Sequence, residues 1–62
     1  MSPRETEIIL WLSHGKTTGQ ICEILGLRPA TVEGYKRDAM DRLGAANVTS
    51  LVAAALRKGI IQ

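Results

Sequence analysis

The chain has 62 residues, a net charge of +2 at pH 7 and a hydrophobic fraction of 45%, with one Trp, one Tyr and no Phe. This length excludes a multidomain protein, and we predict one all-α domain over residues 1–62. A domain of this size buries only about 60% of the surface of its unfolded chain, so we expect it to gain stability from a partner or a second copy. The single cysteine and single histidine exclude an intrachain disulfide and a zinc ligand set. We expect no metal and no cofactor, and a cytoplasmic location, because no stretch resembles a signal peptide or a membrane span.

Positive charge is concentrated in the middle of the chain. The sequence pI is about 9.1, a mildly basic value that permits nucleic-acid binding without demanding it. Acidic residues are interspersed among these cations, so the pattern is that of a mixed surface rather than a basic tail. The cations between residues 16 and 42 are Lys16, Arg28, Lys36, Arg37 and Arg42.

The first predicted helix spans residues 3–14. Ser2 and Glu5 have the spacing of a capping box, and Pro3 stands at the first helical position, where its missing N–H costs nothing. His14 and Gly15 are typical of a helix end, and His14 has no catalytic partner in the sequence. The apolar side of this helix is predicted to contain Ile8, Ile9, Trp11 and Leu12.

The second predicted helix spans residues 18–25 and has a second capping box, formed by Thr17 and Gln20. Lys16 stands just before this amino terminus, and Thr17 and Thr18 carry hydroxyl groups. Free amides, hydroxyls and a lysine at a helix start make an anion site suited to a DNA phosphate. The alternative is that these residues only cap the helix.

Residues 20–37 read as two helices around a turn at Gly26, the pattern of a helix-turn-helix unit. The third predicted helix spans residues 29–43 and ends at Gly44. We expect Cys22 to be a small buried residue, where it lets the helices approach, and Val32 to wedge them apart. The predicted buried stripe of the third helix contains Val32, Tyr35, Ala39 and Leu43.

The opposite face of the third helix is small or polar and is the candidate for reading bases. Gly34 in mid-helix costs about 1 kcal/mol relative to Ala. It either permits close approach to DNA or is tolerated at a solvent-facing position. Arg28 stands at the predicted N-cap, where it offers no side-chain oxygen and places a cation at the positive helix end. It either meets a phosphate or extends into water.

The fourth predicted helix spans residues 48–58, with Asn47 as its N-cap and Gly59 after its end. It is apolar over most of its circumference, so a face left exposed would be expected to contact a partner. The alternative is that Ile60 and Ile61 fold back and cover it.

Taken together, four stretches resemble the LuxR-type (GerE-type) helix-turn-helix domain along nearly the whole chain: SPRETEI, GKTTGQICEILGL, ATVEGYKRDAMDRLGAAN and ALRKGII. The resemblance implies a four-helix DNA-binding domain of a bacterial transcription regulator that acts as a homodimer through its fourth helix. In the family this domain is usually the carboxyl-terminal part of a longer protein, and sensing of a ligand or phosphorylation lies in a separate domain. The run from Ala39 to Leu43 leans towards quorum-sensing members.

The resemblance also assigns functional positions. The base-contacting positions correspond to Glu33, Gly34 and Arg37. The phosphate-contacting positions correspond to Lys16, Thr17, Thr31, Tyr35 and Lys36, to which local reasoning adds Thr18 and Arg28. The dimer interface is predicted at Val48, Leu51, Val52 and Ala55. Family members often have a basic or polar residue in place of Glu33, an apolar side chain in place of Gly34 and His in place of Tyr35.

The chemistry of two of these residues agrees with base reading. Arg37 can donate two hydrogen bonds to guanine O6 and N7, and Glu33 can accept one from cytosine N4. Glu33 and Arg37 also have i, i+4 spacing, so an intrahelical ion pair is the competing interpretation, and both can hold.

The leading hypothesis is therefore sequence-specific binding of double-stranded DNA at a two-fold symmetric operator, with helix 29–43 in the major groove and RNA polymerase as a further partner. One alternative is region four of a sigma factor, which shares the Pro-Arg-Glu start and the helix-turn-helix but not the fourth-helix pattern. Another is a protein interaction module without DNA binding. An enzyme is not expected, because nucleophile, base and metal sets are all missing.

Overall fold

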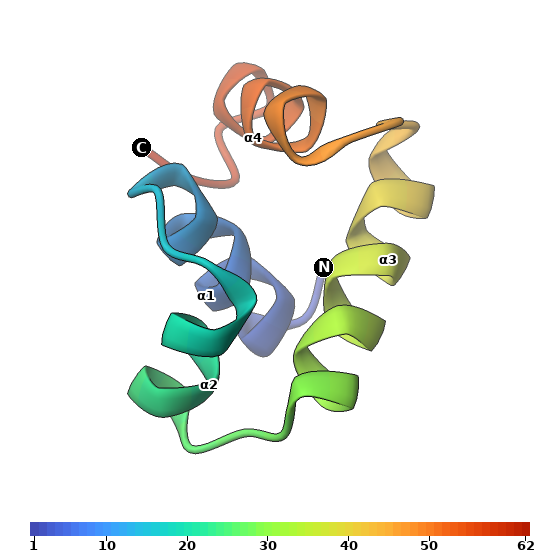
Figure 1. Ribbon diagram of the computed structural model, residues 1–62. Coiled ribbons are helices and arrows are strands. Elements are labelled where there is room, and N and C mark those ends of the chain that lie inside the picture. Colours follow the sequence, from blue (N-terminus) through green and yellow to red (C-terminus); the bar gives the residue numbers. More distant parts are fainter.

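The computed structural model describes residues 1–62 as four helices without strands (Figure 1). They are α1 (Pro3–Ser13), α2 (Thr18–Leu25), α3 (Pro29–Leu43) and α4 (Val48–Arg57). The predicted all-α fold is confirmed. Each helix begins at the predicted residue, and α1 and α4 end one residue before the predicted end, because His14 and Lys58 are C-caps outside the helices.

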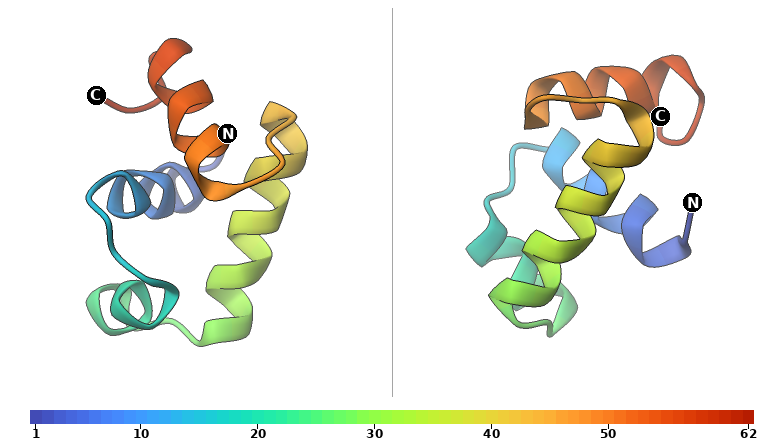
Figure 2. Two further views of the ribbon diagram at one scale, coloured as in Figure 1. Left: turned by 45° about the horizontal axis from the view of Figure 1, so that its top comes forward. Right: turned by 90° about the vertical axis from the view of Figure 1, so that its right-hand side faces the viewer.

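α1 packs against α3 and α4, while α3 also packs against α2 and α4. Figure 2 shows α2 beside the first turns of α3 and α4 across its last turns. The two ends of α3 therefore belong to different parts of the molecule, one at α2 and one at α4. None of the four helices has the length and apolar content that crossing a membrane requires.

Two apolar clusters hold this arrangement. The α2 cluster joins α1, α2 and the first half of α3, and consists of Ile8, Ile21 and Val32. The α4 cluster joins α1, the second half of α3, α4 and the chain end, and consists of Ile9, Ala39, Leu51, Ala55 and Ile61. Burying each large aliphatic side chain contributes about 1.5–3 kcal/mol. Because Ile8 and Ile9 enter different clusters, α1 connects the two halves of the domain.

The chain end covers part of α4. Ile61 is only 5% exposed and belongs to the α4 cluster, and Ile60 packs against that cluster. Ile60 and Ile61 therefore cover part of α4, as in the alternative, while Leu56 on the same helix stays 49% exposed. Leu51 and Ala55 are both 0% exposed. Both were predicted to lie in a dimer interface, but in this chain they face its own core.

The predicted caps form with one difference. Thr17 and Gln20 make the reciprocal capping box, and Asn47 accepts a hydrogen bond from the backbone N–H of Ser50 at 2.8 Å. At the start of α1, Ser2 Oγ accepts from the backbone N–H of Glu5 at 3.2 Å. The carboxylate of Glu5 does not return to the Ser2 backbone; it accepts from Ser2 Oγ at 2.9 Å. Only half of the predicted box on residues 2–5 is present.

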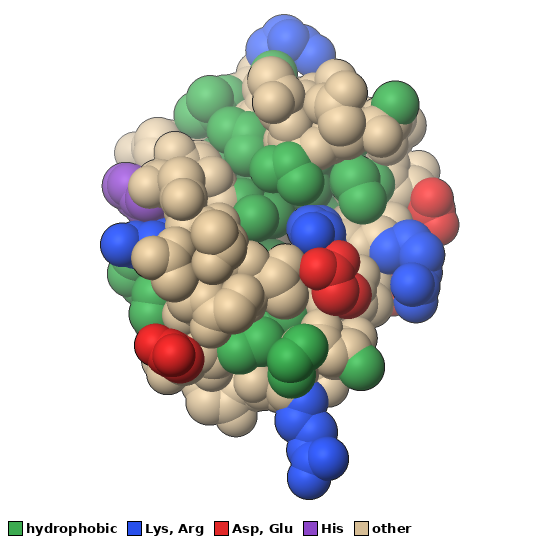
Figure 3. Space-filling view, in the orientation of Figure 1, with side chains coloured by type: hydrophobic (Ala, Val, Ile, Leu, Met, Phe, Trp, Pro, Cys, Tyr) green, Lys and Arg blue, Asp and Glu red, His purple; other side chains and the backbone are tan.

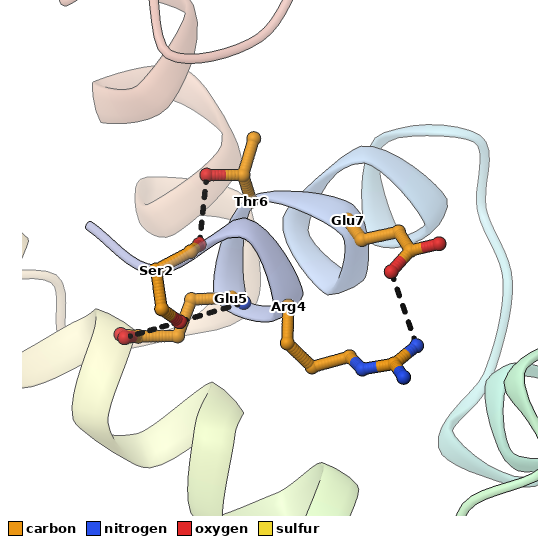
Figure 4. Close-up of polar contacts among 5 residues, drawn as sticks. All are labelled: Ser2, Arg4, Glu5, Thr6 and Glu7. Atoms are coloured by element: carbon orange, nitrogen blue, oxygen red, sulfur yellow. Dashed lines mark hydrogen bonds and ion pairs between the residues drawn. The ribbon is translucent and has the colours of Figure 1, made fainter.

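Glu5 is turned towards α3 instead, as Figure 4 shows. Its side chain is 5% exposed, and its Oε2 lies 3.5 Å from Nε of Arg42 on α3. Arg4 and Glu7 pair on the other side of α1, at 3.1 Å, where both side chains are largely in water and the pair contributes little (Figure 4). Glu5 and Arg42 therefore make an ion pair between α1 and α3, in which the Arg42 side chain is 60% exposed and Oε2 of Glu5 is buried without a hydrogen bond.

Candidate nucleic-acid interface

The turn between α2 and α3 has the predicted helix-turn-helix geometry. Gly26 adopts φ +68°, a left-handed conformation that favours glycine, and its N–H donates to the carbonyl of Cys22 at 2.8 Å. Ile21 on α2 and Val32 on α3 are each 0% exposed and pack together below the turn. Cys22 is half-buried rather than fully buried as predicted, since it lies at the edge of this cluster.

The predicted buried stripe leaves the opposite face of α3 free. Val32 and Ala39 are 0% exposed, and Tyr35 and Leu43 are partly buried against the two clusters. Away from this stripe lie the three candidates for base contact, Glu33, Gly34 and Arg37. A Cβ added to Gly34 would meet only Nη2 of Arg37, at 4.0 Å. The guanidinium of Arg37 therefore lies over the gap that Gly34 leaves.

Glu33 is held by two phosphate-contact candidates. Its Oε1 accepts from the hydroxyl of Thr18 at 2.8 Å and from Nζ of Lys36 at 3.2 Å, and its Oε2 lies 3.0 Å from the same Nζ. Lys36 Nζ also donates to Thr18 Oγ1 at 3.4 Å. We call these residues the Thr18–Glu33–Lys36 cluster. It joins the first residue of α2 to the middle of α3.

The ion pair between Glu33 and Arg37, which was the interpretation competing with base reading, does not form. Glu33 pairs with Lys36 instead, three residues along the helix, because the Thr18 hydroxyl draws the carboxylate towards α2. Hydrogen bonds from Lys36 and Thr18 lower the pKa of Glu33, and the positive charges of Lys36 and Arg37 act in the same direction. Arg37 is thus left exposed with no carboxylate partner.

The other phosphate-contact candidates lie at the two helix starts. Thr17 is exposed, and its hydroxyl oxygen accepts from the backbone N–H of Gln20 in the cap, while Lys16 is half-buried beside it. Arg28 is the exposed N-cap of α3 and makes no side-chain cap hydrogen bond, as predicted. Thr31 is exposed one turn further on. Of all these candidates, only Thr18 and Lys36 are joined by a hydrogen bond between their side chains.

Sequence reasoning missed two contacts. The bond between Thr18 and Glu33 spans 15 positions in the chain and depends on how α2 packs against α3. The contact between Glu5 and Arg42 likewise joins distant segments. The Glu33–Lys36 pair did have a signal, since i, i+3 is a spacing at which opposite charges meet on a helix.

Residues 1–55 match the model of the family described as bacterial regulatory proteins, luxR family. This match includes the turn, all of α3 and most of α4. The chain belongs to this family. Because the fourth helix is the element that distinguished this family from sigma factor region four, the sigma-factor alternative is set aside. The family comprises DNA-binding transcription regulators and is not an enzyme family.

Several curated relatives resemble the chain over almost all its length. The HTH-type quorum sensing-dependent transcriptional regulator VjbR of Brucella abortus is 44% identical over 98% of this chain, which covers 24% of VjbR. The transcriptional activator protein BjaR1 of Bradyrhizobium diazoefficiens is 44% identical over 98% of the chain and 25% of BjaR1. RpaR of Rhodopseudomonas palustris, another quorum sensing-dependent regulator by its name, is 42% identical over 100% of the chain and 26% of RpaR. The chain spans about a quarter of the length of these relatives.

Proposed function

We propose that this chain is the sequence-specific DNA-binding part of a dimeric transcription regulator, with α3 in the major groove. The observation that carries the proposal is the exposed face of α3, where Glu33, Gly34 and Arg37 stand free of the core while Val32 and Ala39 hold the opposite side. The major groove of B-DNA admits an α-helix and presents a distinct donor and acceptor pattern for each base pair. Membership of the luxR family supports the same function.

Within this proposal the residues have different roles. Arg37 donates to guanine and is the principal base contact, since its guanidinium is exposed and unpaired. Lys16, Thr17, Thr18, Arg28, Thr31, Tyr35 and Lys36 position the helix by contacting phosphates at the starts of α2 and α3. Gly34 has no side chain to contact a base, and its role is to let the backbone of α3 approach the DNA closely. One copy therefore reads few bases.

A reading surface this small requires a second copy, and we assign its contact to the outer side of α4. Leu56 is 49% exposed, and Val48, Val52 and Ala53 are partly exposed on the same helix. Figure 3 shows hydrophobic side chains gathering on the part of the surface where α4 lies. Val48 and Val52 thus stay in the proposed interface, while Leu56 and Ala53 replace Leu51 and Ala55.

The whole regulator is proposed to respond to a quorum-sensing signal and to act on RNA polymerase. The names of VjbR and RpaR, of which this chain covers only about a quarter, support the response to a quorum-sensing signal. The action on RNA polymerase follows from the proposed role in transcription alone. Any site for the signal would belong to a part of the regulator outside these residues.

Selection of bound fragments from random DNA tests the proposal. We expect a two-fold symmetric consensus, because two copies related by symmetry read two half-sites. On that consensus, Arg37→Ala should relax the choice of sequence, costing about 1–3 kcal/mol against the preferred base only. Lys36→Ala should weaken binding to all sequences and reduce the salt slope by about 1. Equal losses for Arg37→Ala on consensus and random DNA would contradict these roles.

The competing function is a protein interaction module without DNA binding. It is favoured by the net charge of only +2 and by Glu33, which occupies Lys36 on the face proposed to meet DNA. A gel shift at moderate salt separates the two functions. Sequence-dependent binding in the nanomolar range would reject the interaction module, and the absence of any sequence preference would support it.

A further inference from the structure

The Thr18–Glu33–Lys36 cluster brings together the groups that a DNA phosphate would use. A hydroxyl at the first residue of a helix and a lysine ammonium are both common phosphate donors. Here both donate to a carboxylate, at 2.8 Å from Thr18 and 3.2 Å from Lys36. An anion from the protein itself thus occupies the place where an anion of the ligand would bind.

The carboxylate is able to leave this place. The side chain of Glu33 is 48% exposed, whereas that of Lys36 is 17% exposed and is held between α2 and α3. Glu33 therefore has room to turn outward, and Lys36 stays where it is. Because Lys36 and Thr18 lower the pKa of Glu33, the carboxylate is charged at neutral pH and does not free these groups by protonation.

We propose that Glu33 competes with DNA phosphate for Lys36 and Thr18, so that its carboxylate must be displaced before this domain binds DNA tightly. This proposal rests on the proposed DNA-binding function and assigns Glu33 a role in specificity. A phosphate brought beside the carboxylate without displacing it would meet a like charge. At a separation of about 4 Å in water, that repulsion weakens binding about fivefold.

Displacement affects DNA sequences unequally. On most sequences the displaced carboxylate faces base edges or phosphates that have no hydrogen-bond donor. It then loses its contacts to Lys36 and Thr18 without gaining a new one, and binding is weaker. On a sequence that places cytosine N4 beside Glu33, the carboxylate gains a hydrogen bond. Glu33 therefore raises specificity mainly by weakening binding to the wrong DNA, a way of discriminating that needs no further contact to the right one.

The test measures binding of the 62-residue chain to a 20-base-pair duplex of random sequence by fluorescence anisotropy at several salt concentrations. We expect Glu33→Gln to bind about fivefold more tightly than wild type at low salt, with a salt slope steeper by about 1. Asp38→Asn is the matched control, since it removes the same charge from α3 at an exposed residue that makes no hydrogen bond or ion pair. Its effect should be less than about twofold.

A double-mutant cycle separates competition for Lys36 from repulsion between Glu33 and the charge of the DNA as a whole. In a Lys36→Met background, which keeps an apolar stem against α2, Glu33→Gln should tighten binding by less than about twofold, because no ammonium then draws a phosphate to within about 4 Å of the carboxylate. The proposal would be overturned if Glu33→Gln still raised the affinity fivefold in that background. It would also be overturned if the Glu33→Gln single variant bound random DNA no more tightly than wild type. Circular dichroism shows whether each variant keeps its helices.

The same measurements distinguish this proposal from the one on which it rests. If wild type binds neither random nor selected DNA at low salt, the DNA-binding function is overturned, and the competition by Glu33 with it. If wild type binds selected DNA but Glu33→Gln shows no higher affinity for random DNA, only the competition is overturned.

Discussion

The two ends of α3 are supported in different ways. At its start, α2 is held by a cluster of three buried residues and by the polar contacts of Thr18, Glu33 and Lys36. At its end, α4 and the chain terminus contribute to a cluster of five buried residues, and Glu5 pairs with Arg42 nearby. At the α2 end the exposed face of the domain is polar, whereas at the α4 end the exposed face is apolar.

This difference separates two tasks within 62 residues. A polar, solvated face can exchange water and internal partners for DNA groups without exposing the core. An apolar face gains most from meeting another apolar face. The comparison predicts that changes at the α4 end act on folding and assembly, whereas changes of the exposed polar side chains at the α2 end act on DNA binding with little effect on stability.

The largest effect is expected for Leu51→Ala. Leu51 is 0% exposed within the α4 cluster, and truncation of such a residue costs about 2–5 kcal/mol. Leu56→Ala is the matched control on the same helix, because Leu56 is 49% exposed, and should change stability by less than about 0.5 kcal/mol. Urea denaturation followed by circular dichroism measures both. Sedimentation should show weaker self-association for Leu56→Ala, and equal stability losses would contradict the assignment of faces.

Ile61→Ala should cost less, about 2 kcal/mol. Ile61 is 5% exposed and seals the α4 cluster, but it lies one residue from the end of the chain, where the backbone can relax around the smaller side chain. The same denaturation experiment checks this value. A loss below about 0.5 kcal/mol would mean that the chain end does not cover α4 in solution.

Gly34→Ala is expected to stabilise the domain by about 1 kcal/mol. Its added Cβ meets only the flexible end of Arg37, at 4.0 Å. Gly26→Ala is the control, because φ +68° at the helix end strains any residue with a Cβ and should destabilise by about 1–2 kcal/mol. If Gly34→Ala is more stable but binds selected DNA more weakly, Gly34 serves close approach to DNA. Unchanged DNA binding would instead mean that glycine is only tolerated there.

The smallest effect concerns acid pH. The pKa of Glu33 is lowered in the folded state, so its contribution to stability is present above the unfolded pKa and is lost as the pH falls through the folded one. Because the side chain is 48% exposed, the contribution is only roughly 0.3 kcal/mol. Comparing wild type with Glu33→Gln in urea at pH 7 and pH 3 measures it. A larger difference at pH 3 than at pH 7 would contradict the lowered pKa.

The proposed site was partly predictable from the sequence. Helical spacing put Glu33, Gly34 and Arg37 on one face of α3, and the capping pattern put Thr17 at the start of α2. For Glu33, the i, i+4 pair with Arg37 was only a competing interpretation, and the structure has the i, i+3 pair with Lys36, which the position of Thr18 favours. The burial of Leu51 and Ala55 on α4 was not predicted, for a related reason. An all-apolar helix does not reveal which side its own domain covers.

The sequence by itself determined the four helices, their starts, the turn at Gly26 and the buried stripe of α3, because these depend on residues within a few positions of one another. Tertiary structure alone decided that Ile61 closes the core, that Leu51 and Ala55 face inward, that Glu5 meets Arg42 and that Glu33 meets Thr18. Each of these contacts joins side chains whose distance depends on how two helices pack. Local spacing contains no information about that packing.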